Sequence, residues 1–313
     1  MSSVVISVDA ELGWGFHDLK DPPQKRVEYA RNGWIQLHTL CERYSIPATW
    51  AIVGHLLLDE CDGAHLSHPT PPGWFARERD QWRLRPDLRF GGELVRALQA
   101  SELDHDIGSH TFSHVLFDDP RLDEAVIKAE IEAAKDAAKP YGIEYDSFVF
   151  PRNAVGYREV LADAGFRVYR GSAPQQLTHQ RQWEKLSATI NPDRVPLVEP
   201  VVDEYGLVDV PPSVFLFGFQ GLPRVVCETL WMDPIVRQVT GAIDNALSSG
   251  GVVHLWLHPN DLVTERDVNR LETIFAYIDA KRNSGLAVET LADVADRVLQ
   301  TEQDYQQVSL LNQ

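Results

Sequence analysis

Short apolar, β-branched runs alternate with longer amphipathic stretches along the whole chain. This alternation is typical of parallel strands that are joined by helical crossovers. The predicted strands cover residues 4–8, 48–53, 105–108, 147–150, 168–170, 206–210, 252–257 and 286–288. The predicted helices cover residues 25–44, 92–100, 122–141, 157–164, 234–248, 265–281 and 291–299. The order of these elements predicts an α/β fold of the (β/α) barrel class, in which catalytic groups gather at the carboxyl ends of the strands.

Two stretches interrupt the alternation. Residues 65–89 are rich in Pro, Trp and Arg, and we interpret them as an excursion that packs on its own aromatic side chains. Residues 177–204 have little periodicity and form either a lid over the site or a surface insertion; a surface insertion is the simpler interpretation of both stretches. With 313 residues and 44% hydrophobic composition, we expect one domain over residues 1–302 and a loose polar tail at 303–313.

Charge and cysteine content limit the partners of this chain. Its 46 acidic and 29 basic residues give a formal net charge of −17, which repels nucleic acid and anionic membrane surfaces, so no nucleic-acid partner is expected. Cys41, Cys61 and Cys227 are widely spaced and form no C-x-x-C, so neither a disulfide framework nor a cysteine metal site is expected. Cys41 and Cys227 have apolar neighbours and are expected to fill the core.

The start of the chain bears on where the protein works. Met1 is followed almost directly by an apolar strand, without the cationic start, apolar stretch and cleavage site of a signal peptide. No window reaches about 18 uninterrupted apolar residues, so a membrane-spanning helix is not expected. We therefore expect a cytoplasmic protein without a transmembrane segment.

The strongest chemical signal is a pair of histidines, His110 and His114, that follows Gly108 and Ser109. On an extended strand the two histidines would lie roughly 13 Å apart. On a helical turn they share a face, and metal–nitrogen bonds of about 2.0–2.1 Å require that they converge. The alternative is two unrelated imidazoles at the start of a helix, and the residues at the other strand ends decide between the two interpretations.

Polar groups also follow other predicted strands. Asp9 and Glu11 end the first strand, and because side chains alternate along a strand, both are expected on one side at the barrel mouth. His258 ends a buried strand, whereas His254 lies within the same strand and is expected to be an interior histidine with satisfied hydrogen bonds. A further strand end carries a cation and an amide, Arg152 and Asn153.

This set of groups indicates a class of reaction. One carboxylate and two imidazoles complete a three-ligand site with an open position for a zinc-like ion. Such an ion lowers the pKa of its bound water and polarises a carbonyl group. A second carboxylate can take the proton of the water, and a separate histidine can protonate a leaving amine. Together these groups describe the hydrolysis of an amide.

The order of the motifs resembles the polysaccharide deacetylase family, the NodB-homology carbohydrate esterases. The resemblance spans nearly the whole chain and rests on Asp9-x-Glu11 and on residues 48–54, 107–114, 150–153 and 257–259. It implies a distorted (β/α)7 barrel with a divalent metal, usually zinc, that removes acyl groups from amino sugars. It also implies that Asp9 is the catalytic base, that His110 and His114 bind the metal, and that His258 is the general acid.

The chain departs from the family pattern in three motifs. The family has two adjacent aspartates, of which the second binds the metal; here Ala10 takes that place, and we expect Glu11 to be the third ligand. The usual arginine before the proline is absent, so Arg152 either replaces it or binds a substrate phosphate or sugar hydroxyl. The aspartate that tunes the catalytic histidine is not recognisable; Asp209 is the nearest candidate and could equally be a residue at the end of a strand.

The leading hypothesis is therefore a metal-dependent deacetylase or deformylase of an N-acylated sugar. Its substrate would be an intermediate of a cytoplasmic surface-polysaccharide or glycoconjugate pathway, carried on a nucleotide or on a lipid. Trp14, Arg152 and Asn153 are expected to line the sugar site, because an aromatic face suits a pyranose ring. The alternatives are an allantoinase-like hydrolase of a small amide or ureide, and a non-catalytic carbohydrate-binding barrel.

Overall fold

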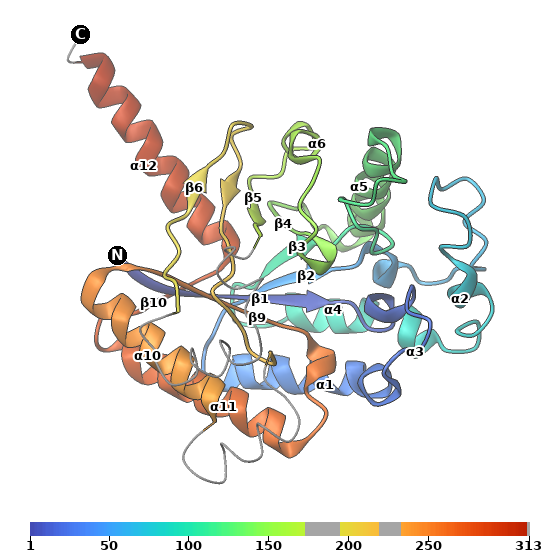
Figure 1. Ribbon diagram of the computed structural model, residues 1–313, viewed down its shortest axis with the longest axis horizontal. Coiled ribbons are helices and arrows are strands. Elements are labelled where there is room, and N and C mark those ends of the chain that lie inside the picture. The colour runs from blue at the N-terminus through green and yellow to red at the C-terminus, as the bar shows by residue number, and fades with distance from the viewer. Residues whose placement is uncertain (173–194, 219–232, 312–313) are drawn as a thin grey trace.

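The fold is built on one curled sheet, whose strands are nearly all parallel (Figure 1). The computed structural model describes residues 1–172, 195–218 and 233–311. The order of the strands in the sheet is β6-β7-β5-β4-β3-β2-β1-β9-β8, and β10 pairs with β1. The strands are β1 (Ser2–Ala10), β2 (Thr49–Ile52), β3 (Asp106–Ser109), β4 (Ser147–Val149), β5 (Val168–Arg170), β6 (Val201–Val202), β7 (Val208–Asp209), β8 (Val214–Phe215), β9 (Gly251–Leu257) and β10 (Ala287–Glu289).

Helices connect the strands and cover the sheet. Figure 1 shows α1, α10 and α11 along one side of the sheet, and α5, α6 and α12 along the other. The helices are α1 (Gln24–Arg43), α2 (Ala76–Arg79), α3 (Pro86–Arg89), α4 (Gly92–Gln99), α5 (Glu124–Ala138), α6 (Arg158–Asp163), α10 (Pro234–Ser249), α11 (Glu265–Arg282) and α12 (Leu291–Leu311). Short 3-10 turns follow several strands at their carboxyl ends: η1 (Trp14–Phe16), η2 (Gly54–Leu57), η4 (Pro151–Asn153) and η6 (Pro259–Asp261).

The elements agree with the alternation of the sequence. Every predicted strand and helix has a counterpart within the described residues, and the additions are the short strands β6 and β8 and the small helices α2 and α3. Helix α12 runs to Leu311, so residues 303–311 are helical rather than a loose tail. Most of the predicted insertion at 177–204, and Cys227, lie outside the described residues. None of the helices in the described ranges is long and apolar enough to cross a membrane.

Alternation along the strands decides which side chains enter the barrel. On β1, Val4, Ile6 and Val8 belong to the large apolar core, whereas Asp9 has the opposite parity. On β5, the central Tyr169 packs in the same core, and the neighbouring Arg170 points the other way. Because parallel strands carry their carboxyl ends to one edge, polar residues with this parity meet at that edge of the barrel.

Candidate active site

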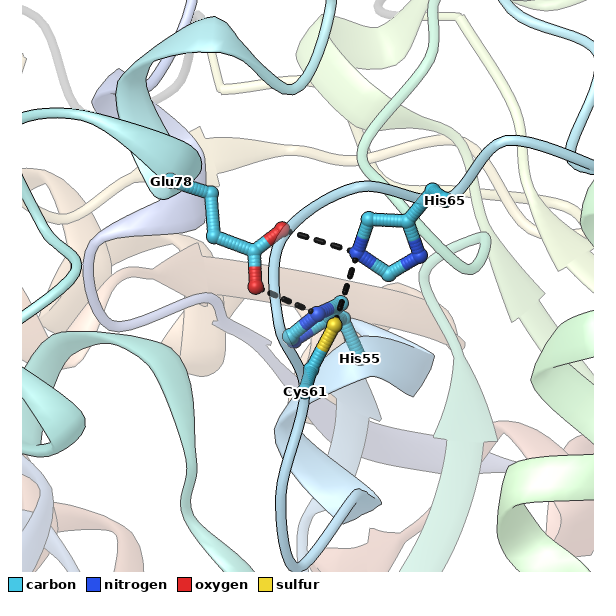
Figure 2. Close-up of side chains that lie close together, drawn as sticks. All are labelled: His55, Cys61, His65 and Glu78. Carbon is cyan, nitrogen blue, oxygen red and sulfur yellow. Dashed lines mark hydrogen bonds and ion pairs between the residues drawn. The ribbon is translucent and has the colours of Figure 1, made fainter.

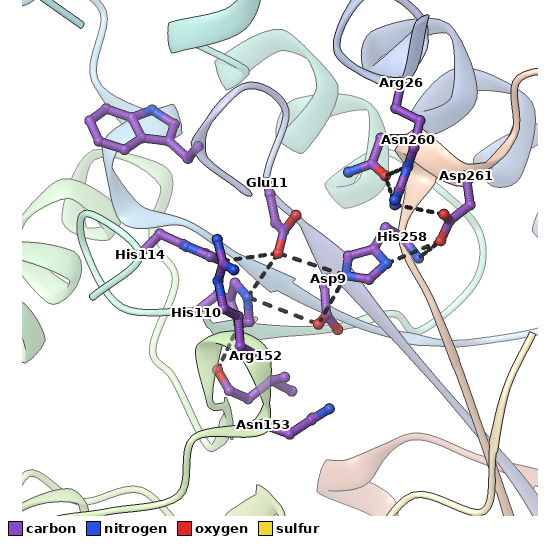
Figure 3. A network of polar contacts seen from close by, with 12 residues as sticks. Asp9, Glu11, Arg26, His110, His114, Arg152, Asn153, His258, Asn260 and Asp261 are labelled. Atoms are coloured by element: carbon purple, nitrogen blue, oxygen red, sulfur yellow. Dashed lines mark hydrogen bonds and ion pairs between the residues drawn. The ribbon is translucent and has the colours of Figure 1, made fainter. Parts of the chain in front are cut away.

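Glu11, His110 and His114 meet at the carboxyl edge of the sheet (Figure 3). Glu11 follows β1, and the two histidines follow β3, which is separated from β1 by β2. Glu11 Oε1 lies 3.3 Å from His110 Nε2 and 3.1 Å from His114 Nε2. All three side chains are buried. The structure thus brings together the three residues that the sequence suggested as metal ligands.

The two imidazoles converge through an irregular turn rather than the predicted helical turn. Residues 110–114 contain no helix, and Thr111 and His114 adopt left-handed backbone angles with φ values of 63° and 64°. Such angles are unfavourable for residues with a side chain and require support from their surroundings. The His110 and His114 ring centroids lie 5.2 Å apart. The prediction that this segment bends was right, but the helical geometry was wrong.

Glu130 on helix α5 holds this turn through hydrogen bonds. Its Oε2 accepts hydrogen bonds from the backbone N–H groups of Phe112 and Ser113, at 3.0 and 2.8 Å. Its Oε1 accepts from the Ser113 hydroxyl and lies 2.6 Å from His68 Nε2. Glu130 is fully buried, so no water can replace a partner that is lost. Its four partners therefore hold the carboxylate in one position. Sequence reasoning missed Glu130, although Ile127, Ile131 and Ala134 place it on the buried face of α5.

The hydrogen bonds around the histidines show that the three residues fit a divalent metal. His110 Nδ1 lies 2.7 Å from the carbonyl oxygen of Val149, so Nδ1 carries the hydrogen and Nε2 keeps its lone pair. That lone pair faces the Glu11 carboxylate, which also has only lone pairs to offer. A cation or a proton between them removes the repulsion. One carboxylate and two imidazoles are a common donor set for zinc.

The backbone around Glu11 leaves little freedom for its side chain. A Cβ atom at Gly15 would lie 1.9 Å from Glu11 Oε2, so any other residue there would displace the carboxylate. Burial alone would raise the pKa of Glu11, but His258, His110 and His114 together hold it well below its ordinary value. Glu11 is therefore ionised, which a metal ligand requires.

Asp9 is paired with an arginine that sequence reasoning did not single out. Arg170 at the end of β5 donates to both carboxylate oxygens of Asp9, at 2.5 and 2.7 Å. Arg170 in turn is oriented by Asn153, whose Oδ1 accepts from Arg170 Nε at 3.0 Å. Although burial raises the pKa of Asp9, the Arg170 guanidinium outweighs it and keeps that pKa below its ordinary value. A cation at the end of an otherwise apolar strand was the available signal for Arg170.

His258 faces the same site from the end of β9. Its Nε2 lies 3.7 Å from Asp9 Oδ2 and 3.9 Å from Glu11 Oε1 (Figure 3). Its Nδ1 lies 3.0 Å from Oδ2 of Asp261, and the other oxygen of Asp261 pairs with Arg26 at 2.6 Å. Burial lowers the pKa of His258, but the surrounding carboxylates outweigh it and raise that pKa to about 9.

The aspartate that orients His258 is therefore Asp261, and the candidate Asp209 is the strand-end residue of the alternative interpretation. Asp209 lies on β7, where a Cβ at Gly171 would meet it, and burial raises its pKa to about 6. The correct residue was close at hand in the sequence, three positions after the histidine in the segment His258-Pro259-Asn260-Asp261. The expectation for His254 is met: it is fully buried, with Nε2 2.9 Å from the Ser7 hydroxyl.

The residues expected to line a sugar site lie in different surroundings. Trp14 is fully buried, with its ring 4.4 Å from that of His55, so it has no exposed face for a pyranose. Arg152 is half-exposed and pairs with Asp18 at 2.6 Å. Asn153 holds Arg170 rather than facing outward. The sequence prediction for Trp14 thus conflicts with its burial, because the 65–89 excursion covers it.

A cavity of about 440 Å³ opens beside the histidine turn. Its lining includes His17, whose ring centroid lies 6.1 Å from that of His114. It also includes Trp74, which donates from Nε1 to the carbonyl oxygen of Ser113 at 3.0 Å. Small-molecule sites span roughly 300–1,000 Å³, so this volume suits one. Asp18, the partner of Arg152, lies on the same wall.

In sequence, the chain matches no family model and no curated protein. Solved structures share its fold. A "putative polysaccharide deacetylase" from Mycobacterium smegmatis is 15% identical with a TM-score of 0.61, covering 96% of this chain and 91% of that one. A "probable Polysaccharide deacetylase" from Pseudomonas aeruginosa PAO1 is 14% identical with a TM-score of 0.57, covering 94% and 89%. An allantoinase is 13% identical with a TM-score of 0.57, covering 94% and 89%.

These structural matches establish the arrangement of the backbone. At such low sequence identity they do not establish the activity, which must be argued from the side chains. Each of the three structures aligns over most of its own length, so the match extends over the whole barrel. The chain therefore has the fold of the polysaccharide deacetylases, the distorted (β/α)7 barrel that the order of its motifs predicts.

Proposed function

We propose that this protein is a metal-dependent hydrolase that removes an acetyl or formyl group from the nitrogen of an amino sugar. The observation that carries the proposal is the convergence of five groups at one edge of the barrel. A carboxylate and two imidazoles form one cluster, and a second carboxylate and a third imidazole face it within 4 Å. The chemistry of amide hydrolysis needs this combination.

Glu11, His110 and His114 would hold the divalent metal, for which zinc is the best match to the donor set. When bound there, such an ion supplies Lewis acidity toward an amide carbonyl and makes a coordinated water more acidic. The chain contributes the orientation of its ligands. Val149 fixes the tautomer of His110, Glu130 fixes the turn that carries both histidines, and Gly15 leaves room for the Glu11 carboxylate.

Asp9 and His258 are the proposed base and acid. Asp9 is ionised and held by Arg170, so it is oriented to accept a proton from an attacking water. His258, with its pKa raised to about 9, is protonated at neutral pH and can give its Nε2 proton to the departing nitrogen. Opposite protonation states in neighbouring groups allow one site to supply both a base and an acid.

The cavity beside the histidine turn is the proposed sugar site. Trp74 takes the stacking role that the sequence suggested for Trp14, because Trp74 lines the cavity and Trp14 is buried. Arg152 reaches the same wall through Asp18 and is placed to meet a sugar hydroxyl or a phosphate. A phosphate would be present if the sugar is carried on a nucleotide or a lipid. Cys41 and Cys61 are free thiols, which fits the cytoplasm as the compartment of such an intermediate.

The test is release of acetate or formate from a panel of N-acetylated and N-formylated amino sugars, free, nucleotide-linked and lipid-linked. The panel also contains ureides and cyclic imides, so that an allantoinase-like activity is detected if it exists. We expect release from amino sugars, loss after treatment with a chelator, and recovery with Zn²⁺. Full activity in chelator, or turnover of the ureides alone, would refute the proposal.

Variants give the second arm of this test. Asp9→Asn and His258→Gln preserve size and are expected to lower kcat by about 10²–10⁴-fold, the usual range for a lost general base or acid. Asp209→Asn is the matched control, because it removes a carboxylate outside the cluster. If Asp9→Asn left the activity unchanged, Asp9 would not be the base; if the wild type released nothing from any member of the panel, the non-catalytic binding role would replace the enzymatic one.

A further inference from the structure

A second group of metal-type donors lies between β2 and α4, partly in the excursion at 65–89. His55, Cys61, His65 and Glu78 each offer one donor atom, and the four atoms lie within 4.8 Å of one another (Figure 2). His65 Nε2 lies 2.8 Å from Glu78 Oε2 and 3.1 Å from Cys61 Sγ, and His55 Nε2 lies 2.9 Å from Glu78 Oε1. None of these residues belongs to the active-site cluster.

The contacts of His55 show that hydrogen bonds alone do not account for this group of residues. Its Nδ1 lies 3.3 Å from the carbonyl oxygen of Arg89, and the tautomer that donates to this carbonyl has its lone pair on Nε2. Nε2 is buried and has no aligned hydrogen-bond partner, although Glu78 Oε1 is only 2.9 Å away. Two atoms that each present a lone pair repel each other at this distance unless a proton or a metal cation lies between them, and the poor alignment at Nε2 favours the metal cation. His110 and Glu11 face each other in the same way.

His65 and Cys61 present the same problem. One hydrogen on His65 Nε2 can point directly at either Glu78 or Cys61, but both are within contact distance. A cation serves both at once. Cys61 Sγ also accepts the backbone N–H of Gly63 at 3.2 Å, which partly opposes the burial that raises the pKa of this thiol.

The distances suit a tetrahedral ion. With bonds of about 2.0–2.3 Å, the donors of a tetrahedral zinc site stand roughly 3.3–3.8 Å apart. The contacts of 2.8–3.1 Å and the limit of 4.8 Å bracket this range, so small side-chain movements suffice. Arg89 donates to Glu78 Oε1 at 2.7 and 3.1 Å and so orients the carboxylate from outside the group.

We propose that His55, Cys61, His65 and Glu78 form a second, structural zinc site. Four protein donors leave no open position, which distinguishes it from the three-residue catalytic cluster. The sequence predicted no cysteine metal site because the chain has no C-x-x-C pair. The proposed site needs no such pair, since it combines one cysteine with two histidines and a glutamate. Cytosolic thiols remain reduced and are available to metals.

The site would fix the excursion against the barrel. His55 comes from η2, directly after β2, Cys61 lies in the segment that follows, and His65 and Glu78 belong to the excursion at 65–89. The His65 ring stacks on Phe75 with centroids 4.1 Å apart, and the neighbouring Trp74 bonds to the histidine turn. One ion would thus connect a strand end, the wall of the cavity and the support of the catalytic turn.

The test measures zinc per chain by mass spectrometry of the metal, after loading with Zn²⁺ and dialysis. We expect about two ions in the wild type, and about one in the double variant Cys61→Ser/His65→Gln. His110→Gln/His114→Gln is expected to hold the second-site ion alone. Circular dichroism checks that each variant is folded. Equal zinc in the wild type and in the folded Cys61/His65 variant would overturn the second site.

The same experiment separates this proposal from the proposed function. If the His110/His114 variant keeps all the wild-type zinc, the catalytic metal is refuted and the second site stands. A wild type with a single ion that disappears in the His110/His114 variant overturns the second site and leaves the catalytic one.

Cobalt gives a spectroscopic readout of ligation by sulfur. Co²⁺ bound to a thiolate has a sulfur-to-metal charge-transfer band in the near ultraviolet, and nitrogen and oxygen donors do not produce it. We expect the band in wild-type protein loaded with Co²⁺, its loss in Cys61→Ser, and its persistence in Cys41→Ala, which alters a buried core cysteine. A wild-type spectrum without the band, or a band that Cys61→Ser leaves intact, would contradict ligation by Cys61.

Discussion

Buried charges in the active site are held in pairs, and the pair of Asp9 and Arg170 is the tightest. The side chains of both residues are at most 2% exposed. Arg170 also lies 4.6 Å from the centroid of the Trp256 ring, which covers the guanidinium from one side. Removing one member of such a pair is costly, because the other remains as a buried charge without compensation.

We therefore expect strong coupling between these two residues. Arg170→Met should lower the free energy of unfolding by about 3–5 kcal/mol, and Asp9→Asn should also destabilise the protein. The double variant should lose clearly less than the sum of the two, because it leaves neither charge alone. Urea denaturation in the presence of a chelator measures the free energy of unfolding of the wild type, the two single variants and the double variant. Arg167→Met, which breaks exposed pairs, is the control and should change stability by less than about 1 kcal/mol. Additive losses would show that the pair is not coupled.

Asp261 sets the protonation of His258 by its charge and its position. The pKa of His258 is about 9 because the carboxylates of Glu11, Asp261 and Asp9 outweigh its burial. A general acid is active while protonated, so activity should fall as the pH rises through that value. Asp261→Asn removes one negative charge, lowers the pKa of His258, and should move the alkaline limb of kcat/KM to lower pH by about one unit. Glu265→Gln, on the exposed start of α11, should leave the limb in place. An unmoved limb in Asp261→Asn would exclude His258 as the group that titrates.

At the scale of elements, the histidine turn depends on helix α5. The turn contains residues with positive φ, and its carbonyl groups at Thr111 and Phe112 accept from the backbone N–H groups of Gly54 and His55. Glu130 supplies acceptors for two of its N–H groups and connects it to the excursion through His68. The ligand geometry is therefore an outcome of how α5 packs against the turn.

We expect Glu130→Gln to loosen the turn without touching a proposed ligand. One amide oxygen replaces two carboxylate oxygens, so some of the bonds to Phe112, Ser113 and His68 must be lost. Zinc affinity should fall by about 10–100-fold, as is usual when an outer partner of a ligand is altered. A competition assay with a chelating dye measures this affinity. Glu132→Gln, an exposed residue of the same helix, is the matched control. Equal affinities in the two variants would show that the turn is stable without Glu130.

The elements were predictable from sequence because each strand is a short apolar run with a defined end. The residues at those ends, Asp9, Glu11, His110, His114 and His258, could be named because parallel strands bring their ends together. The sequence contained signals for Arg170, Asp261 and Glu130 as well, but not their roles, because these depend on which neighbour each side chain reaches. Pairing between distant elements leaves no periodic signal in the chain.

At the scale of the whole molecule, the same limit applies to the second cluster. His55 and Glu78 are far apart in sequence, and the segment between them, which includes most of the 65–89 excursion, has no regular pattern. Its aromatic content correctly indicated packing on its own side chains, as Phe75 and His65 show. Trp14 is buried by the same packing, which the sequence pattern did not predict. A tryptophan beside a strand end can equally well line a binding site or fill the apolar core.

The edge of the barrel away from the active site contains a carboxyl group that should make stability depend on pH. Asp106 begins β3 and accepts hydrogen bonds from Thr49 at the start of β2 and Ser147 at the start of β4, at 2.8 and 2.6 Å. Its Oδ2 also lies 3.4 Å from the backbone nitrogen of Ala292 on α12. Burial raises the pKa of Asp106 from 3.8 to about 6, despite these bonds.

The sign of the effect follows from this raised pKa. The folded state binds the proton of Asp106 more tightly than the unfolded state, so the contribution to stability is complete below pH 3.8 and is lost as the pH rises through about 6. Asp106→Asn cannot titrate. The free energy of unfolding of the wild type, relative to this variant, should therefore fall by about 2 kcal/mol between about pH 4.5 and 7.5. Urea denaturation across this range measures it, with the exposed Asp104→Asn as control. Wild-type and Asp106→Asn curves that run parallel would show that Asp106 is ionised throughout, and that the strands at this edge are joined by a charged carboxylate.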